Sequence, residues 1–332
     1  MSDELTASDE GPEEPETGNT ETTDTPKTAG KGRVRERARK DAFRWIYAAY
    51  MVALVVALMV GGSMSGSHPM LIALAADVAA TVVIFCFSFA FGNSSFYDAY
   101  WSVAPLPIAI YWAATSPLEA SVVRQIVVIA LILAWGARLT SNWAQGWTGL
   151  SHEDWRYEKF RESYPRAYWF ISLGGIHLMP TLWVFGGLLP VYAAVGVGTQ
   201  GFGVIDLVAT AITGGAIWVE ARADKELRAF KAWQPDGEEV LSSGLWALSR
   251  HPNYFGEMTF WWGLFVFALA ADPAYWWTGI GPVSIMLMFK FASLPMIEGH
   301  MRERRPGYDE RTRGTSLVVP WPKRRDGAEA ER

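Results

Sequence analysis

Residues 71–91 read LIALAADVAATVVIFCFSFAF, an apolar run in which Asp77 is the only charged side chain. A helix needs about 20 apolar residues to cross the hydrocarbon core of a bilayer. A helix on the surface of a water-soluble protein instead carries one apolar stripe and one charged face. Because this run is apolar all round, it predicts a transmembrane helix.

Seven further apolar runs follow the same rule. They are Trp45–Gly62, Ala99–Thr115, Val122–Leu139, Trp169–Leu189, Val204–Glu220, Tyr254–Ala271 and Trp276–Pro295. Only 19% of the residues are charged, whereas a soluble domain usually has about a quarter. The sequence therefore predicts an all-α, polytopic bundle of about eight membrane-spanning helices, in the inner membrane if the source is bacterial.

The basic residues predict the orientation of this bundle. A cluster from Lys31 to Arg44 precedes the first run, and Lys and Arg concentrate on the cytoplasmic side of membrane helices. With eight crossings, every Lys and Arg except Arg124 falls in a cytoplasmic loop, helix end or tail. Both termini are therefore expected in the cytoplasm. Because the basic residues follow the helix ends, nucleic-acid binding is not expected.

The first 30 residues hold nine carboxylates and one lysine, although the whole chain has a net charge of −5. Such a segment has little apolar surface to bury. We expect a disordered tail over residues 1–40, a membrane domain over 41–322 and a second tail over 323–332. Cys86 is the only cysteine, so no disulfide or cysteine-rich metal site forms within the chain, and no metal site is predicted. The oligomeric state stays open.

Polar residues collect in three segments on the cytoplasmic side. The first, Arg138–Tyr157, alternates amide, charged and aromatic side chains, including Asn142, and fits either a ligand site or an interfacial helix. In the second, Asp224 and Arg228 share one helix face, which fits a ligand site or a solvated face. The third, from Glu298 to Tyr308 and beyond, is basic and fits a site or contact with anionic headgroups.

The second segment continues into Ser-Arg-His-Pro-Asn-Tyr-Phe-Gly-Glu, residues 249–257. Pro252 suits the first turn of a helix, and the free N–H groups at a helix start favour phosphate. Arg250 and His251 add positive charge. Asn253 and Glu257 lie four residues apart on one face, and an ionisable group such as Glu257 inside the apolar region is a functional candidate.

The nonapeptide 249–257 resembles the C-terminal signature of the steroid 5-alpha-reductase family, which includes the sterol C14 and C7 reductases. Arg138–Tyr157 looks like the hallmark of an uncharacterised bacterial branch of that family, and the resemblance covers roughly residues 95–322. It implies a polytopic reductase that binds NADPH at the cytoplasmic side. It also implies reduction of a carbon–carbon double bond, commonly conjugated to a ketone, in a lipid-like substrate taken from the bilayer.

The resemblance also implies roles for individual residues. The expected cofactor-binding residues are Arg138, Asn142, Asp224, Arg228, Arg250, His251, Asn253, Tyr254, Glu257 and Tyr308. The steroid enzymes carry a catalytic Glu seven residues before a Pro, and Asp98 stands seven before Pro105. Their substrate-facing Tyr corresponds to Trp135 here. This departure leaves Asp98 and Tyr97 as the catalytic candidates, with Tyr100 as an alternative to Tyr97.

Two other functions are open on sequence grounds. Membrane methyltransferases of the isoprenylcysteine carboxyl type share Arg-His-Pro-x-Tyr and use S-adenosylmethionine, but they usually carry an apolar residue where this chain has Glu257. A transporter or lipid-binding protein would place polar groups at mid-membrane in broken helices, often in repeated halves. Asp77 and Asp206 are the only carboxylates inside other apolar runs, and no internal repeat is visible. NADPH-dependent reduction is the function we expect.

Overall fold

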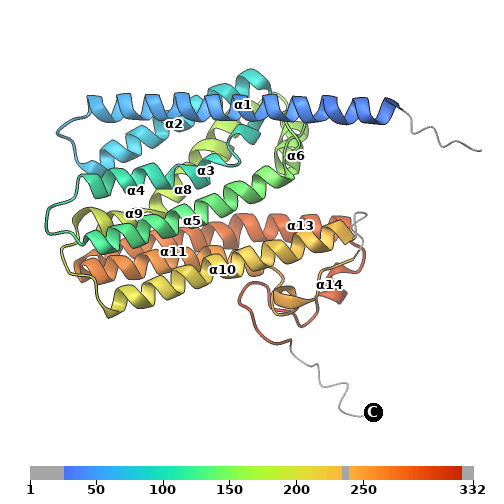
Figure 1. Cartoon of the computed structure of the whole chain (residues 1–332). Helices are drawn as coiled ribbons and strands as arrows, with labels where there is room; N and C mark the ends of the chain where they lie inside the picture. Colours follow the sequence, from blue (N-terminus) through green and yellow to red (C-terminus); the bar gives the residue numbers. More distant parts are fainter. Residues whose placement is uncertain (1–25, 234–238, 324–332) are drawn as a thin grey trace, which may run out of the picture.

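The computed structural model describes residues 26–233 and 239–323, with side chains from residue 37 onward. All regular elements in this part of the chain are helices, apart from one isolated bridge between Ser249 and Ser316. They form an elongated bundle whose long helices run roughly parallel and antiparallel to one another (Figure 1).

Seven helical segments among the described residues are long and apolar enough to cross a bilayer. Four are single helices: α1 (Pro26–Ser63), α2 (Pro69–Phe91), α5 (Val122–Gly146) and α10 (Val204–Trp233). A fifth is α11 (Pro252–Ala271). The sixth, Tyr168–Val197, joins α7 (Tyr168–Ile171), η2 (Ser172–Leu178), α8 (Met179–Gly187), α9 (Leu189–Val191) and η3 (Tyr192–Val197). The seventh, Pro273–Arg304, joins η5 (Pro273–Gly279), α12 (Ile280–Met288), η6 (Phe289–Ser293) and α13 (Leu294–Arg304). The chain is thus an all-α, multi-pass membrane protein.

The eighth predicted run, Ala99–Thr115, is a shorter and interrupted helix. It consists of α3 (Tyr100–Val103) and α4 (Pro105–Ala114). Pro105 has no N–H group to donate, so the hydrogen-bond ladder is broken at this point. The segment still returns the chain along α5 from one end of the bundle to the other (Figure 1). It packs closely, because a Cβ at Gly136 of α5 would collide with the carbonyl oxygen of Ser102.

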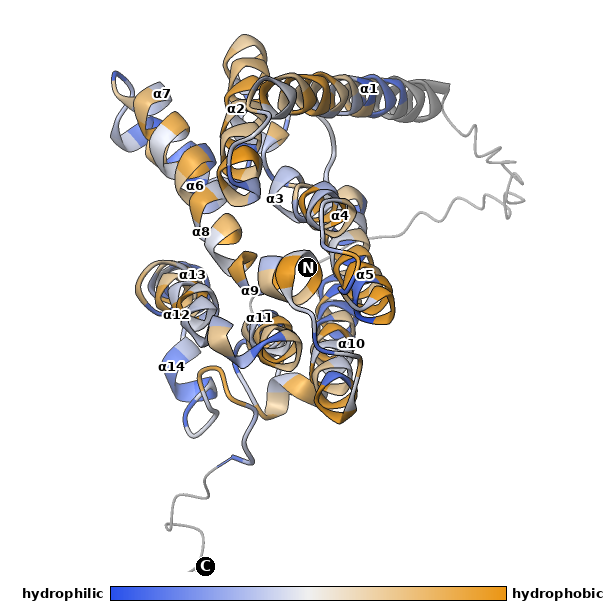
Figure 2. Ribbon diagram, turned by 90° about the vertical axis from the view of Figure 1, so that its left-hand side faces the viewer, coloured by the Kyte–Doolittle hydropathy of each residue, from blue (hydrophilic) through white to orange (hydrophobic). Residues whose placement is uncertain are grey.

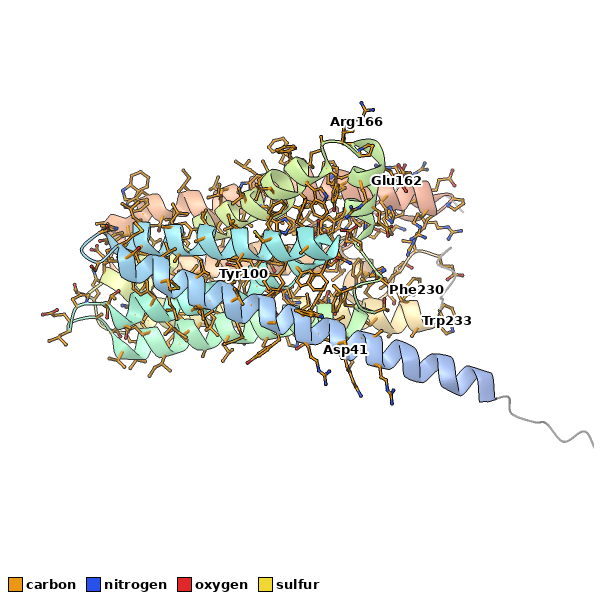
Figure 3. The ribbon with its side chains drawn as sticks, turned by 90° about the horizontal axis from the view of Figure 1, so that it is seen from above. Asp41, Tyr100, Glu162, Arg166, Phe230 and Trp233 are labelled. Carbon is orange, nitrogen blue, oxygen red and sulfur yellow. The ribbon has the colours of Figure 1, made fainter. Side chains whose placement is uncertain are left out.

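The two ends of the bundle differ in composition. One end carries α6 (Trp155–Ser163), the end of α13 and α14 (Tyr308–Arg311), together with the basic loops (Figure 1). We call it the inner end, because the positive-inside rule assigns it to the cytoplasm. Glu162, Arg166, Phe230 and Trp233 gather there, whereas Tyr100 lies within the bundle (Figure 3).

The first helix begins earlier than the sequence predicted. The tail was expected to reach residue 40, but α1 already begins at Pro26, so residues 26–40 are helical and the prediction is corrected there. Residues 1–25 and 324–332, which make up the rest of the two predicted tails, lie outside the described residues. At the other end of the membrane domain, Trp321 still donates a backbone hydrogen bond to Leu248.

Aromatic side chains fill the core between the helices. Trp135 of α5 stacks on Phe260 of α11 with ring centroids 4.8 Å apart, and Trp261 meets Trp135 edge-on at 5.4 Å. Trp112 is fully buried. Large apolar side chains such as Trp218 and Val204 point outward instead, where a bilayer would solvate them. Figure 2, seen from the outer end, shows hydrophobic residues along most of the spans.

An ion pair holds three helices together at the outer end. Arg124 of α5 is fully buried and forms a two-pronged contact with Asp206 of α10, at 2.6 and 3.0 Å. The same guanidinium donates to the carbonyl oxygens of Gln200, Gly201 and Ala270. Its charge and its terminal donors are therefore compensated inside the protein, as burial of an arginine requires.

Candidate functional site

The first part of the candidate site is an ion cluster around Arg138, where α5, α10 and α11 meet near the inner end. Arg138 forms ion pairs with Glu220 and, at 2.6 Å, with Asp224, and it lies 3.9 Å from Glu257. Three carboxylates therefore surround one guanidinium that is only 13% exposed. Arg138 is thus the cation that these three buried acidic side chains share, so its removal would leave them without a partner of opposite charge at this point.

Glu257 is held on both sides by tryptophan. The indole N–H of Trp135 donates to its Oε2 at 3.0 Å, and that of Trp261 to its Oε1 at 2.9 Å. Gly256, the preceding residue, allows α11 to approach α10 closely, because a Cβ there would collide with the side chain of Glu220. The side chain of Glu257 is thus fixed between two indole N–H groups at the edge of the ion cluster.

Two further predicted residues complete this cluster. Arg228, one turn beyond Asp224 on α10, donates to the side-chain oxygen of Asn142 on α5. The structure therefore brings together five of the predicted cofactor-binding residues, Arg138, Asn142, Asp224, Arg228 and Glu257. Sequence reasoning did not assign Glu220 to the site. Its signal was present, since Glu220 stands four residues before Asp224 on the same helix face.

The second part of the site is a cavity of about 180 Å³ at the inner end. Its polar lining contains Arg250, His251, Asn253, Tyr254 and Tyr308 from the predicted set, with Lys231, Arg305 and Arg311. Several cationic and hydrogen-bond-donating groups therefore face one space, which is the arrangement that binds an anion.

Glu298 of α13 organises this cavity, and the sequence did not single it out as a site residue. Its Oε2 accepts a hydrogen bond from Arg250 at 2.6 Å. Its Oε1 lies 2.7 Å from the ring Nε2 of His251 and accepts a hydrogen bond from the hydroxyl of Tyr308 at 2.8 Å. Burial and this hydrogen bond raise the pKa of Tyr308 above its usual value. Tyr308 therefore keeps its proton and remains a donor.

Two polar atoms beside the cavity have no partner in the protein. The Nε of Arg250 and the Oδ1 of Asn253 are buried and form no hydrogen bond. Leaving such a group unsatisfied costs about 1–3 kcal/mol, so a donor or acceptor from outside the protein is expected at this position.

The cavity and the ion cluster are neighbouring sites and do not form the single pocket that the sequence suggested. Asn253 lines the cavity, whereas Glu257, one turn further along α11, points to Arg138 and the two tryptophans. Residues four apart on a helix have Cβ atoms about 6 Å apart. The prediction of one shared pocket is therefore corrected: one helical turn joins two polar clusters.

The catalytic candidates Asp98 and Tyr97 lie apart from both clusters. Asp98 accepts a hydrogen bond from Tyr157 at 2.7 Å and a longer one from Trp143 at 3.4 Å. Tyr97 points the other way and shares a hydrogen bond with Thr181 at 2.8 Å. The two neighbours thus do not act on one point, and among the described residues neither contacts Arg138 or Glu257.

Asp98 is expected to make stability depend on pH. Burial raises its pKa from 3.8 to about 6, against the opposing effect of the Tyr157 hydrogen bond. The folded state then holds this proton more tightly than the unfolded state. Its contribution is fully present below pH 3.8 and is lost as the pH rises through 6, by about 3 kcal/mol.

The measurement compares unfolding of the wild type and Asp98→Asn in detergent between pH 3.5 and about 7.5. The wild type should lose stability relative to the variant as the pH rises through this window. A stability difference that does not change with pH would show that Asp98 ionises normally.

Comparisons with known proteins agree with a membrane protein whose function is not established. No solved structure matches the chain. An uncharacterised protein of Schizosaccharomyces pombe is 24% identical over 239 residues, which cover 65% of this chain and 69% of that protein. The model of the family described as "Protein of unknown function (DUF1295)" matches residues 84–315, a range that includes both polar clusters. The chain therefore belongs to the DUF1295 family.

Proposed function

We propose that this protein is a membrane oxidoreductase that binds NADPH at its inner end and reduces an activated carbon–carbon double bond of a lipid-like substrate. The observation that supports it most is the cavity beside the ion cluster. There the unpartnered Arg250 Nε and Asn253 Oδ1 lie among cationic groups at the start of a membrane helix. The resemblance of residues 249–257 to the steroid 5-alpha-reductase signature points in the same direction.

The lining of the cavity fits a phosphate-bearing cofactor in its chemistry. Arg250, Lys231 and Arg305 supply positive charge, and Tyr308 supplies a hydroxyl. Sites for whole drug-sized ligands usually measure about 300–1,000 Å³, so the cavity of about 180 Å³ holds only one end of a dinucleotide. In this proposal the remainder of the cofactor extends outside the cavity.

Bound NADPH would supply the hydride for the reduction. The protein's own groups would bind and orient the reactants. Arg250 and Lys231 would hold phosphate oxygens, and the free Oδ1 of Asn253 would accept a hydrogen bond. Glu257, fixed by Trp135 and Trp261, would keep the adjacent ion cluster rigid. A lipid-like substrate would enter from the bilayer, and Asp98 or Tyr97 is proposed to act on its carbonyl.

Cofactor binding is the first test. A ligand that binds only the native state at 100 times its Kd raises stability by about 2.7 kcal/mol. We expect NADPH, but not S-adenosylmethionine, to raise the unfolding temperature of the purified protein in detergent. Asn253→Ala should remove most of this shift, because it removes a polar group at the cavity. Gln200→Ala, which truncates an exposed amide at the outer end, should keep it.

Each contrary outcome points to another function. Stabilisation by S-adenosylmethionine alone would replace the proposal with a membrane methyltransferase. Stabilisation by neither compound would leave a lipid-binding or transport protein. An Asn253→Ala variant with a full NADPH shift would place the cofactor elsewhere than in this cavity.

A further inference from the structure

A second series of buried polar groups begins at the inner surface, outside the candidate site. Glu153, which is paired with Arg161 at 3.0 Å, accepts the hydroxyl of Tyr168 at 3.1 Å. The hydroxyl of Tyr168 is hydrogen-bonded to the hydroxyl of Ser94 at 2.7 Å, and the hydroxyl of Ser94 to that of Ser172 at 2.9 Å. These contacts link the loop before α6, the start of the α7–α8 span and η1 (Ser94–Phe96).

His177 continues the series into the membrane region. Its Nδ1 lies 2.8 Å from the carbonyl oxygen of Ser172 and 3.4 Å from the hydroxyl of that residue. Its Nε2 lies 3.0 Å from the hydroxyl of Ser88 on α2. The imidazole is fully buried. An imidazole ring, in which either nitrogen can carry a proton, therefore lies between the surface groups and the interior groups of the series.

The interior part of the series ends at a carboxyl group. The hydroxyl of Tyr97 is hydrogen-bonded to the hydroxyl of Thr181 at 2.8 Å, and the hydroxyl of Thr181 to that of Thr81 at 2.9 Å. Tyr100, which also interacts with Thr81, donates its hydroxyl to Asp77 at 3.0 Å. All of these residues are buried, and Tyr100 is seen within the bundle in Figure 3.

Helix packing alone does not account for two buried members of the series, His177 and Asp77. Ser and Thr commonly join membrane helices by hydrogen bonds, and hydroxyl groups would be enough for that purpose. Elsewhere this protein neutralises a buried carboxylate with arginine, as Arg124 does for Asp206. Within the described part of the chain, no ion pair includes Asp77, and its polar partner is the Tyr100 hydroxyl. An unpaired carboxylate at this depth is so costly that Asp77 must carry its own proton.

We propose that this series is a proton path from the inner surface to Asp77. Each hydroxyl along it can both donate and accept a hydrogen bond, and histidine is a common proton shuttle. The path has one break, between His177 and Tyr97, whose ring centroids lie 5.0 Å apart. Transfer across this break requires the imidazole to turn from Ser88 toward Tyr97. Tyr50 of α1, 5.9 Å from Tyr100 by ring centroids, is a further titratable group beside the terminus.

The role of the path rests on the proposed function. Reduction of a carbon–carbon double bond adds a hydride to one carbon and a proton to the other. Bound NADPH would supply the hydride, and the protein would supply the proton. Water does not reach a site between membrane helices freely, so the proton has to arrive through the protein. In this proposal Asp77 and Tyr100 hold the proton that the reduction consumes. A proton from the cytosol then enters at Glu153 and replaces it along the path.

Infrared spectroscopy of the full-length protein in detergent tests the path without relying on turnover. The wild type should show the band of a protonated buried carboxyl, which Asp77→Asn removes. After transfer to heavy water, that band should shift as deuterium enters. Tyr168→Phe and His177→Phe should each slow the exchange about tenfold or more, because each removes a hydrogen-bonded step worth about 1.4 kcal/mol. Thr213→Ala removes a buried hydroxyl on α10, outside the path, and should leave the rate unchanged.

The outcomes separate the path from the proposed function. Absence of the Asp77 band, or exchange at the wild-type rate in the Tyr168→Phe variant, would overturn the path, and Tyr168→Phe decides the matter if His177→Phe does not fold. NADPH stabilisation is measured on the same variants. If NADPH fails to stabilise the wild type while the exchange rates behave as expected, the reductase proposal falls and the proton path stands.

Discussion

Replacing Arg138 with methionine is expected to lower the free energy of unfolding by about 3–5 kcal/mol, the usual result of breaking a buried ion pair by removing one partner. Arg138 is the cation shared by Glu220, Asp224 and Glu257. Without it, three carboxylates face one another in a setting with little water, and Arg228 remains beside only one end of the cluster. The variant should also lose the stabilisation by NADPH, because the inner ends of α5, α10 and α11 then move apart.

Unfolding in detergent, followed by tryptophan fluorescence, measures the first effect, and the NADPH-induced shift measures the second. Arg138→Lys is the matched control. It keeps the charge but not the planar two-pronged geometry, so it should lose less stability than Arg138→Met. Equal losses in the two variants would show that shape, and not charge, matters at this position. A loss below about 1 kcal/mol in the methionine variant would contradict the ion cluster itself.

Replacing Arg124 with methionine is expected to cost a similar amount, about 3–5 kcal/mol, but without any effect on ligand binding. The substitution leaves Asp206 buried without its partner and frees the carbonyl oxygens of Gln200, Gly201 and Ala270. This site lies at the outer end, opposite the cavity. The NADPH-induced shift should therefore equal that of the wild type, in contrast to Arg138→Met.

A second substitution separates charge from packing at the outer end. In Arg124→Met with Asp206→Leu, both charges are removed, and replacing a buried ion pair by apolar residues is often neutral or stabilising. The double variant should therefore recover most of the loss. If the double variant is no more stable than Arg124→Met alone, the lost hydrogen bonds to the three carbonyl groups, and not the uncompensated charge of Asp206, explain the effect.

The membrane helices were predictable because the length of an apolar run shows whether a helix can cross the hydrocarbon core of a bilayer. A run such as 71–91 has to be apolar over the thickness of the hydrocarbon, and α2 (Pro69–Phe91) matches it within two residues. The break in the run Ala99–Thr115 was not predicted. Proline is tolerated in membrane helices when neighbours satisfy the backbone, so Pro105 alone does not tell whether a helix continues.

Parts of the candidate site were predictable where helical spacing orders the residues. Asp224 and Arg228 share a face by their separation, and Glu257 was noticeable as a charge inside an apolar run. The role of Glu298 depends on packing of α13 against the start of α11, because its partners Arg250 and His251 are 48 and 47 residues away. The spacing of residues along one helix does not reveal which other helix it packs against.

Adjacency in the sequence did not show whether two side chains point to the same place. Tyr97 and Asp98 are adjacent in a short irregular segment, and both are candidates for the catalytic group. The structure turns Asp98 toward Tyr157 and Tyr97 toward Thr181. In a regular helix the angle between consecutive side chains is fixed, whereas in the turn after η1 it depends on backbone angles that the sequence does not reveal.

A side chain of α1 is hydrogen-bonded to the inner end of α5, and this has a consequence for the surrounding lipid. Arg39 of α1 donates to the carbonyl oxygens of Ala144 and Trp147, at the end of the helix that carries Arg138 and Asn142. A helix whose apolar length does not match the bilayer thickness responds by tilting. Tilting of α1 would therefore pull on the last turn of α5, and the thickness of the host bilayer would influence the geometry of the ion cluster.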